Sequence, residues 1–398
     1  MDKILGVLGG VPNTKPRNDD DFADRLVYKT TVGMFILFAI VISTKQYVGD
    51  PIQCWVPAEF TGNQEEYTNN YCWIKNTYYL PYEKNIPKEH EAEKRKIIPY
   101  YQWAPLILGV QALICYLPII LWRYLNKKSG IDVNAIVEAG EKFTNAEAAE
   151  NRDKTLNFMT KLMDRYLANQ RDVPTGCTLS LKHVFSRTCF KWCGRKRGNY
   201  LTTLYLFSKF LLLVSVLGQL FALNFFLGQD FHMYGFDAIR NMFMGEDQAA
   251  SDRFPRVTMC DFKVRRLGNV QRYTVQCVLP INLFNEKIYL FIWFWLAFTA
   301  SVMTFSIVNW MFRFFYSNDR RRYVKKHLSL MDKIGKDPSE KKALAKFVED
   351  YLKQDGIFVL RMVGHNTNAI TATEFVCQLW DNYRTKPFVE RVEDVESV

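Results

Sequence analysis

The chain lacks the short motifs that mark the common nucleotide-binding and hydrolytic sites. None of the patterns G-x-x-x-x-G-K-[ST], G-x-G-x-x-G, H-E-x-x-H or G-x-S-x-G occurs in its 398 residues. Five histidines leave little for a metal-dependent enzyme, and nine cysteines in so long a chain are too few for a small disulfide scaffold. We therefore expect no enzymatic activity, no cofactor and no resident metal.

Charged residues are also absent from four long apolar runs, which cover residues 30–44, 97–122, 210–229 and 288–312. About 20 apolar residues cross the hydrocarbon core of a bilayer as a helix. The first run is short, but it lies between Lys29 and Lys45, whose long side chains can reach the membrane interfaces. Buried helices of a large soluble protein are the alternative, and four such runs with aromatic ends argue against it. The sequence predicts an all-α polytopic membrane protein with four spans.

The spans divide the chain into nine segments. We expect an N-terminal segment 1–25, spans 26–48, 100–124, 201–228 and 288–315, loops 49–99, 125–200 and 229–287, and a C-terminal domain 316–398. Basic residues cluster where loop 125–200 and the C-terminal domain meet the spans. One basic cluster, at residues 94–96, does not fit this pattern, because it lies in loop 49–99. The positive-inside rule then places both termini and loop 125–200 in the cytoplasm. The excess of basic residues at the cytoplasmic span ends, where they can contact anionic lipids, accounts for the net charge of +11. We therefore expect no nucleic-acid partner.

Between the span ends we find no Asp, Glu, Lys or Arg. Ion-coupled transporters and proton pumps need such groups inside the membrane, so the sequence argues against both classes. Four helices cannot enclose a water-filled pore alone, because their lipid-facing sides use most of their surface. Any channel built from this chain must be an oligomer.

Each predicted outer loop contains two cysteines, Cys54 and Cys72 in the first, Cys260 and Cys277 in the second. An even number in an oxidising space indicates two disulfides, for which three pairings exist. We favour Cys54 with Cys277 and Cys72 with Cys260, the pairing closest to an antiparallel ladder, and leave the other two open. A second group lies in loop 125–200 without a C-x-x-C pair, so we expect reduced thiols there and not zinc: Cys177, Cys189, Cys193 and the nearby His183.

The predicted cytoplasmic segments carry helical patterns. Residues 145–171 place apolar side chains on one helical face. In the tail we expect a helix over 339–354 that Gly356 stops, a strand-like or buried segment 357–363, and a capping box of Thr371 and Glu374 that opens the next helix. Together these segments predict a helical cytoplasmic dome.

Several stretches resemble the innexins, the invertebrate gap-junction proteins. The resemblance runs from about residue 20 to about residue 330. Two other four-span families fit less well. Connexins have three cysteines in each outer loop, where this chain has two, and pannexins resemble these stretches less. The matching residues are the signature tetrapeptide Tyr100, Tyr101, Gln102 and Trp103, the first-loop stretches 46–55, 71–73 and 76–81, and the second-loop stretches 258–262 and 276–282.

The resemblance implies a large-pore channel subunit with four transmembrane helices, disulfide-bonded extracellular loops with some β structure, and a helical cytoplasmic dome. It implies a homo-oligomeric ring of eight subunits in the plasma membrane, docked at a gap junction with an opposed ring of the same or another innexin. Ions and small metabolites would diffuse through the pore. The N-terminal segment of the family folds into the pore mouth, which makes Met1, Asp2, Lys3 and Leu5 candidate pore-lining residues.

Residues 63–70 of the first loop are rich in side-chain amides and carboxylates, so this stretch is a candidate contact strip between docked rings. A solvated loop is the alternative. The docking candidates are Asn63, Gln64, Glu65, Asn69 and Asn70. Neither predicted outer loop contains an N-x-[ST] sequon, so no glycan would hold two rings apart. An undocked plasma-membrane hemichannel and a four-span adhesion or scaffold protein remain alternatives to the gap-junction channel.

Overall fold

The computed structural model describes residues 19–81, 86, 96–169, 198–227, 231–244, 254–335 and 337–385. The chain divides into two compact units. We call the first the loop unit, which comprises Leu26–Leu117 and Leu212–Met303. The second is the helical unit, which comprises Met1–Arg25, Pro118–Leu211 and Thr304–Val398.

Four helices are long and apolar enough to cross a membrane: Phe22–Tyr47, Tyr100–Lys127, Tyr200–Leu227 and Pro280–Phe315. The first consists of α2 (Phe22–Arg25), a π-helical turn η1 (Leu26–Thr31) and α3 (Val32–Tyr47); the others are α5, α9 and α11. Helix α11 starts eight residues before the expected span 288–315, because Pro280 takes the first helical position, where its missing N–H costs nothing. The protein is therefore mostly helical, with four candidate transmembrane helices.

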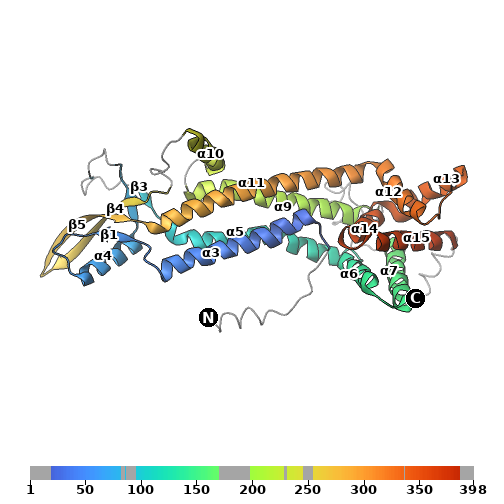
Figure 1. Ribbon diagram of the computed structural model, residues 1–398, viewed down its shortest axis with the longest axis horizontal. Helices are drawn as coiled ribbons and strands as arrows, with labels where there is room; N and C mark the ends of the chain where they lie inside the picture. The colour runs from blue at the N-terminus through green and yellow to red at the C-terminus, as the bar shows by residue number, and fades with distance from the viewer. Residues whose placement is uncertain are drawn as a thin grey trace, which may run out of the picture. The chain divides into compact units, whose positions relative to one another are not determined.

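The loop unit contains a five-stranded antiparallel sheet in the order β1-β5-β4-β2-β3. Its strands are β1 (Gln53–Trp55), β2 (Thr77–Tyr79), β3 (Lys96–Ile98), β4 (Val257–Arg266) and β5 (Asn269–Val278). The first three strands come from the first loop, and β4 and β5 form a long hairpin in the second loop (Figure 1). The described residues of the unit also form α4 (Gly62–Lys75), the 3-10 turn η5 (Phe231–Met233) and α10 (Tyr234–Met244).

The helical unit adds seven elements to the ends of the long helices. They are α6 (Val133–Asn145), α7 (Ala149–Asn169), α12 (Ser317–Leu330), α13 (Pro338–Lys346), the π-helical turn η7 (Phe347–Leu352), α14 (Lys353–Asn366) and α15 (Ala369–Thr385). Phe358 lies at the centre of its core, with ring centroids 5.0 Å from Tyr205, 5.8 Å from Trp310 and 6.3 Å from Trp122. The helical pattern at 145–171 corresponds to α7, which buries Met159 and Met163.

The tail departs from the expected pattern at two places. Gly356 does not stop a helix but lies inside α14, where an added Cβ would lie 3.2 Å from Leu352 and 3.3 Å from Met163. Residues 357–363 are buried as expected, yet they are helical and not strand-like. Thr371 lies two residues inside α15, so it opens no helix; its hydroxyl pairs with that of Thr144 at 2.9 Å.

The expectation of no ionisable residue between the span ends is also wrong. Lys209 lies within the expected span 201–228, in helix α9, and its side chain is fully buried. Asp24 lies two residues before the expected span 26–48, but it is buried in the first of the four long helices, which starts at Phe22. The structure supplies the reason for both, because these residues neutralise each other.

Candidate functional site

Two disulfides join the two loops of the loop unit. Cys54 bonds Cys277, its direct partner in the β1–β5 register, and Cys72 of α4 bonds Cys260 of β4. This is the pairing favoured above. The first disulfide links neighbouring strands and the second fastens α4 to the sheet, so the two loops form one covalently closed structure.

The two disulfides lie side by side. The sulfur atoms of Cys54, Cys72 and Cys277 all lie within 4.8 Å of one another, a spacing that resembles a metal site. All three are disulfide-bonded, and only a thiolate is a good metal ligand. The grouping is therefore a product of the cross-links. The thiols at Cys177, Cys189 and Cys193, with His183, lie outside the described residues.

Helix α4 carries the docking candidates and splits them into two sets. Gln64 accepts a hydrogen bond from the Thr61 amide at 3.0 Å, and Asn69 accepts one from the Cys54 amide at 2.9 Å. These two side chains therefore hold the loop together. Asn63, Glu65 and Asn70 are exposed on the same helix.

The signature residues at the start of α5 contact the first loop. Tyr101 is fully buried, its ring centroid lies 4.8 Å from that of Trp73, and its carbonyl accepts a hydrogen bond of 2.6 Å from Gln46 of α3. Gln102 donates a hydrogen bond to the Trp73 carbonyl. Tyr100 packs edge-on against Phe254 at 5.7 Å. The signature thus joins the first loop to the first two spans, while Trp103 is largely exposed.

A carboxylate ties three strands of the sheet together. Asp261 of β4 accepts hydrogen bonds from Arg272 (2.7 Å) and Thr274 (2.7 Å) on β5 and from Tyr78 (3.2 Å) on β2. It lies in the stretch 258–262 that resembles the innexins. The contacts give this residue a structural role in the sheet.

A buried charge cluster in the helical unit was missed by the sequence reasoning. The Lys209 ammonium donates to Asp21 at 2.7 Å, to Asp24 at 2.9 Å and to the Ser306 hydroxyl at 3.0 Å. The Trp310 indole also donates to Asp21, at 2.8 Å. The cluster fixes the start of the first long helix to α9 and α11. Two aspartates spaced i, i+3 ahead of an apolar run, and one lysine inside another run, were the available signals.

The electrostatics keep Asp21 ionised. Burial alone would raise the pKa of this carboxyl, but the Lys209 charge and the hydrogen bonds from Lys209 and Trp310 hold it well below its usual range. Next to it, Arg25 pairs with Asp20 at 2.7 Å and donates to Asn366 of α14. The chain is thus anchored just after the N-terminal segment. The pore candidates Met1, Asp2, Lys3 and Leu5 lie outside the described residues.

Comparison with known proteins matches these features to one family. The sequence model of the innexins matches residues 20–383. Innexin unc-9 of Caenorhabditis elegans is 40% identical over 365 residues, which are 92% of each chain. Innexin-3 of the same organism is 37% identical over 93% of this chain and 85% of its own length, and its Innexin-11 is 35% identical over 100% and 85%. The chain belongs to the innexin family, whose members form gap-junction channels and are not enzymes.

Proposed function

We propose that eight copies of this chain form a ring around a wide pore and that two rings dock between adjacent cells. The disulfide-linked sheet carries the proposal, because it makes the two loops of each subunit a single rigid body. The described part of each subunit contains four candidate transmembrane helices, too few to enclose a water-filled path, so the proposed pore requires several copies. Ions and small metabolites then diffuse through the pore, and no residue needs to act as an acid, base or nucleophile.

We also propose that the loop unit's sheet faces the extracellular space and that both termini are cytoplasmic. Disulfides form and persist in oxidising compartments, which supports an outer position for both cysteine-containing loops. Basic residues at the ends of the spans next to loop 125–200 and the tail support the same orientation. The plasma membrane at a cell junction is the location that fits.

The docking proposal is now confined to the exposed polar side chains of α4, of which Asn63 and Asn70 share one helical face. Gln64 and Asn69 already bind within the loop, so the exposed side chains Asn63, Glu65 and Asn70 are the better candidates for contact with an opposed ring. Short polar side chains suit an interface of hydrogen bonds and trapped water. The partner ring contains this chain or another innexin.

For the pore, we propose the N-terminal residues Met1, Asp2, Lys3 and Leu5. The anchor formed by Asp21, Asp24 and Lys209 supports this, because it fixes where the N-terminal segment joins the first span. A ring of Asp2 carboxylates would favour cations, and Lys3 beside it would offset part of that charge.

The decisive experiment places a glycan on the proposed docking face. Glu65→Thr creates the sequon that begins at Asn63, and both positions are exposed. Expressed in paired cells that lack their own junctions, wild type is expected to give junctional current. Glu65→Thr is expected to lose that current but to keep its single-membrane hemichannel current.

Glu65→Ala is the matched control, since it removes the same carboxylate without adding a sugar. A glycosidase-sensitive mobility shift in Glu65→Thr alone would show that α4 faces the lumen of the secretory pathway. Full junctional current with a glycan attached would place docking elsewhere. Hemichannel current without junctional current in wild type would favour an undocked channel or an obligate mixed partner.

A further inference from the structure

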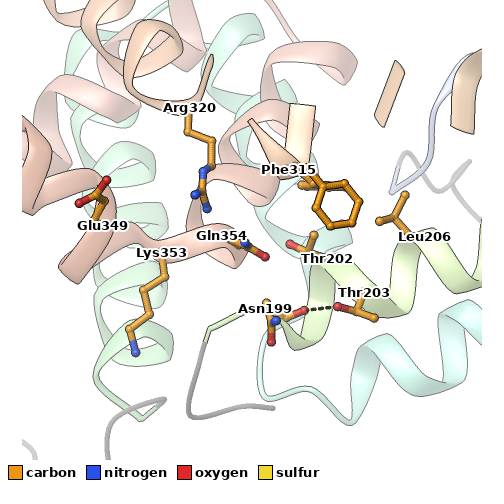
Figure 2. A pocket seen from close by; sticks show the side chains of 10 residues that line it. Asn199, Thr202, Thr203, Leu206, Phe315, Arg320, Glu349, Lys353 and Gln354 are labelled. Carbon is orange, nitrogen blue, oxygen red and sulfur yellow. Dashed lines mark hydrogen bonds between the residues drawn. The ribbon is translucent and has the colours of Figure 1, made fainter. Parts of the chain in front are cut away.

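A cavity of about 750 Å³ lies in the helical unit, at the first turns of α9 and the last residues of α11. Helix α12, the turn η7 and the start of α14 complete its walls. Figure 2 shows basic side chains on one side, from α12 and α14, and the apolar Leu206 and Phe315 on the other. The volume falls in the range of small-molecule sites.

The basic side chains of the cavity are Arg320 and Lys353. Arg320 is half-buried, and its Nε has no hydrogen-bond partner among the described residues. Burial lowers the pKa of Arg320, Glu349 opposes this, and the nearby Arg361 and Arg321 lower it further. The surroundings therefore favour an added negative charge.

Among the described residues that line the cavity, the one acidic side chain is already neutralised. Glu349 accepts hydrogen bonds from both Nε and Nη2 of Arg321, which is paired with it by charge as well. The net charge of Arg320, Lys353, Glu349 and Arg321 is +2, three cations against one anion. Three further basic residues, 195–197, precede the cavity residue Asn199 in sequence.

The apolar wall indicates what kind of anion fits. Leu206 belongs to α9, and Phe314 and Phe315 end α11, so this wall is made by two candidate transmembrane helices near their ends. Phe315 is 66% exposed. The lining also includes the polar Asn199, Thr202, Thr203 and Gln354. A free inorganic or sugar phosphate could bind these and the basic side chains, but it would leave the apolar wall uncovered. A lipid has a charged headgroup for the basic side and acyl chains for the apolar side.

We propose that this cavity binds the phosphorylated headgroup of an anionic phospholipid, with Arg320 and Lys353 on the phosphate and Leu206 and Phe315 against the first part of the acyl chains. Basic pockets beside transmembrane helices are suited to such headgroups, since they combine Coulomb attraction with charge-assisted hydrogen bonds. The assignment concerns lipid regulation of the channel and does not depend on docking.

The test uses the full-length chain in detergent and a fluorescent short-chain phosphatidylinositol bisphosphate, with binding followed by anisotropy. Arg320→Gln and Lys353→Gln are each expected to weaken binding roughly tenfold, and the double variant more. Lys325→Gln removes one exposed charge from the same helix α12, away from the cavity, and should leave affinity unchanged. Arg320→Lys retains the charge and should restore most of the affinity even if Arg320→Gln folds poorly.

Inositol trisphosphate, which has no acyl chains, separates the two sources of phosphate. The proposal requires that it compete weakly and that Phe315→Ser weaken lipid binding without changing headgroup binding. Equal affinity for the free headgroup, with no effect of Phe315→Ser, would assign the cavity to a soluble phosphate instead. Equal losses in Lys325→Gln and Arg320→Gln would reduce the effect to general surface charge and overturn the site.

Discussion

The two units are stabilised by different kinds of contact. In the loop unit, two disulfides cross-link the sheet and α4, and three of the five strands are only three residues long. The helical unit relies on a buried ion cluster and a core of aromatic rings around Phe358. Small, thin structures cannot bury enough apolar surface to be stable alone, and cross-links supply the difference. One unit should therefore respond to reductants and the other to changes of charge.

Removal of the buried cation should have the largest effect. Lys209→Met keeps the length and apolar stem of the side chain but leaves Asp21 and Asp24 buried without a counter-ion. Breaking a buried ion pair in this way costs about 3–5 kcal/mol in the free energy of unfolding. We expect a large drop in the thermal midpoint of the detergent-solubilised protein, measured by tryptophan fluorescence.

A neutral replacement of the whole cluster is the rescue experiment. Lys209→Met combined with Asp21→Asn and Asp24→Asn removes all three charges and should recover much of the lost stability. Lys333→Met breaks a half-exposed pair with Asp381 and should cost at most about 1 kcal/mol. A midpoint for Lys209→Met equal to that of Lys333→Met would mean that the cluster contributes little.

Loss of one disulfide should come next. Cys54→Ser with Cys277→Ser opens a link across 223 residues, and the expected loss is about 2–5 kcal/mol. Wild type should unfold at a lower temperature in reductant, whereas the double variant should shift less, because only Cys72–Cys260 remains to be reduced. An equal shift in both proteins would assign the wild-type response to the second disulfide alone.

A smaller effect is expected at Asp261, which links β4 to β5 and β2. Asp261→Ala leaves the Arg272, Thr274 and Tyr78 donors without their shared acceptor and should cost about 1–3 kcal/mol. Asp261→Asn keeps one acceptor oxygen and should lose less. The thermal midpoints of the two variants test the order, and equal losses would show that the charge, not the acceptor geometry, stabilises the sheet.

The four long helices and the two disulfides could be predicted from the sequence, because they depend on apolar run length and on the number and position of cysteines. The apolar runs predicted four long helices near the right places. The even number of loop cysteines predicted two disulfides, and the expectation of an antiparallel ladder selected the observed pairing from three. The resemblance to the innexins was correct, but what residues 100–103 do in the fold was not readable in sequence. Only the folded chain brings Tyr101 against Trp73 and Gln102 to the Trp73 carbonyl.

The errors occurred where tertiary contacts override local rules. Gly356 was read as a helix stop, yet α14 continues through it. The glycine suits close packing instead, since an added Cβ would lie 3.2 Å from Leu352 and 3.3 Å from Met163. Residues 357–363 looked strand-like by composition, but the aromatic core around Phe358 fixes them as a helix. Lys209 escaped notice because its partners, Asp21 and Asp24, lie about 185 residues away along the chain.

The smallest expected effect is a response of the helical unit to acid. Arg313 can only donate, so the His365 Nε2 that lies 2.9 Å from its guanidinium accepts, and the imidazole is neutral. His365 is partly exposed, but the protein around its ring removes some of its water and so lowers its pKa below the ordinary 6.5, and Arg313 lowers the pKa further. The unfolded chain therefore binds the proton first. This contribution to stability is complete above pH 6.5 and falls as the pH drops from there toward the folded-state pKa.

The buried cluster gives the contrast that sharpens this last prediction. The pKa of Asp21 is lowered, so its contribution is complete above its unfolded value of 3.8 and is lost only in stronger acid. Between about pH 7.5 and about pH 5.5 the contribution of His365 to the thermal midpoint should therefore fall, while that of Asp21 stays constant. His365 is exposed, so solvent screening keeps its share below about 1 kcal/mol. His365→Gln, which still accepts from Arg313 but cannot be protonated, should flatten this slope, whereas an unchanged slope would assign the acid response to another group.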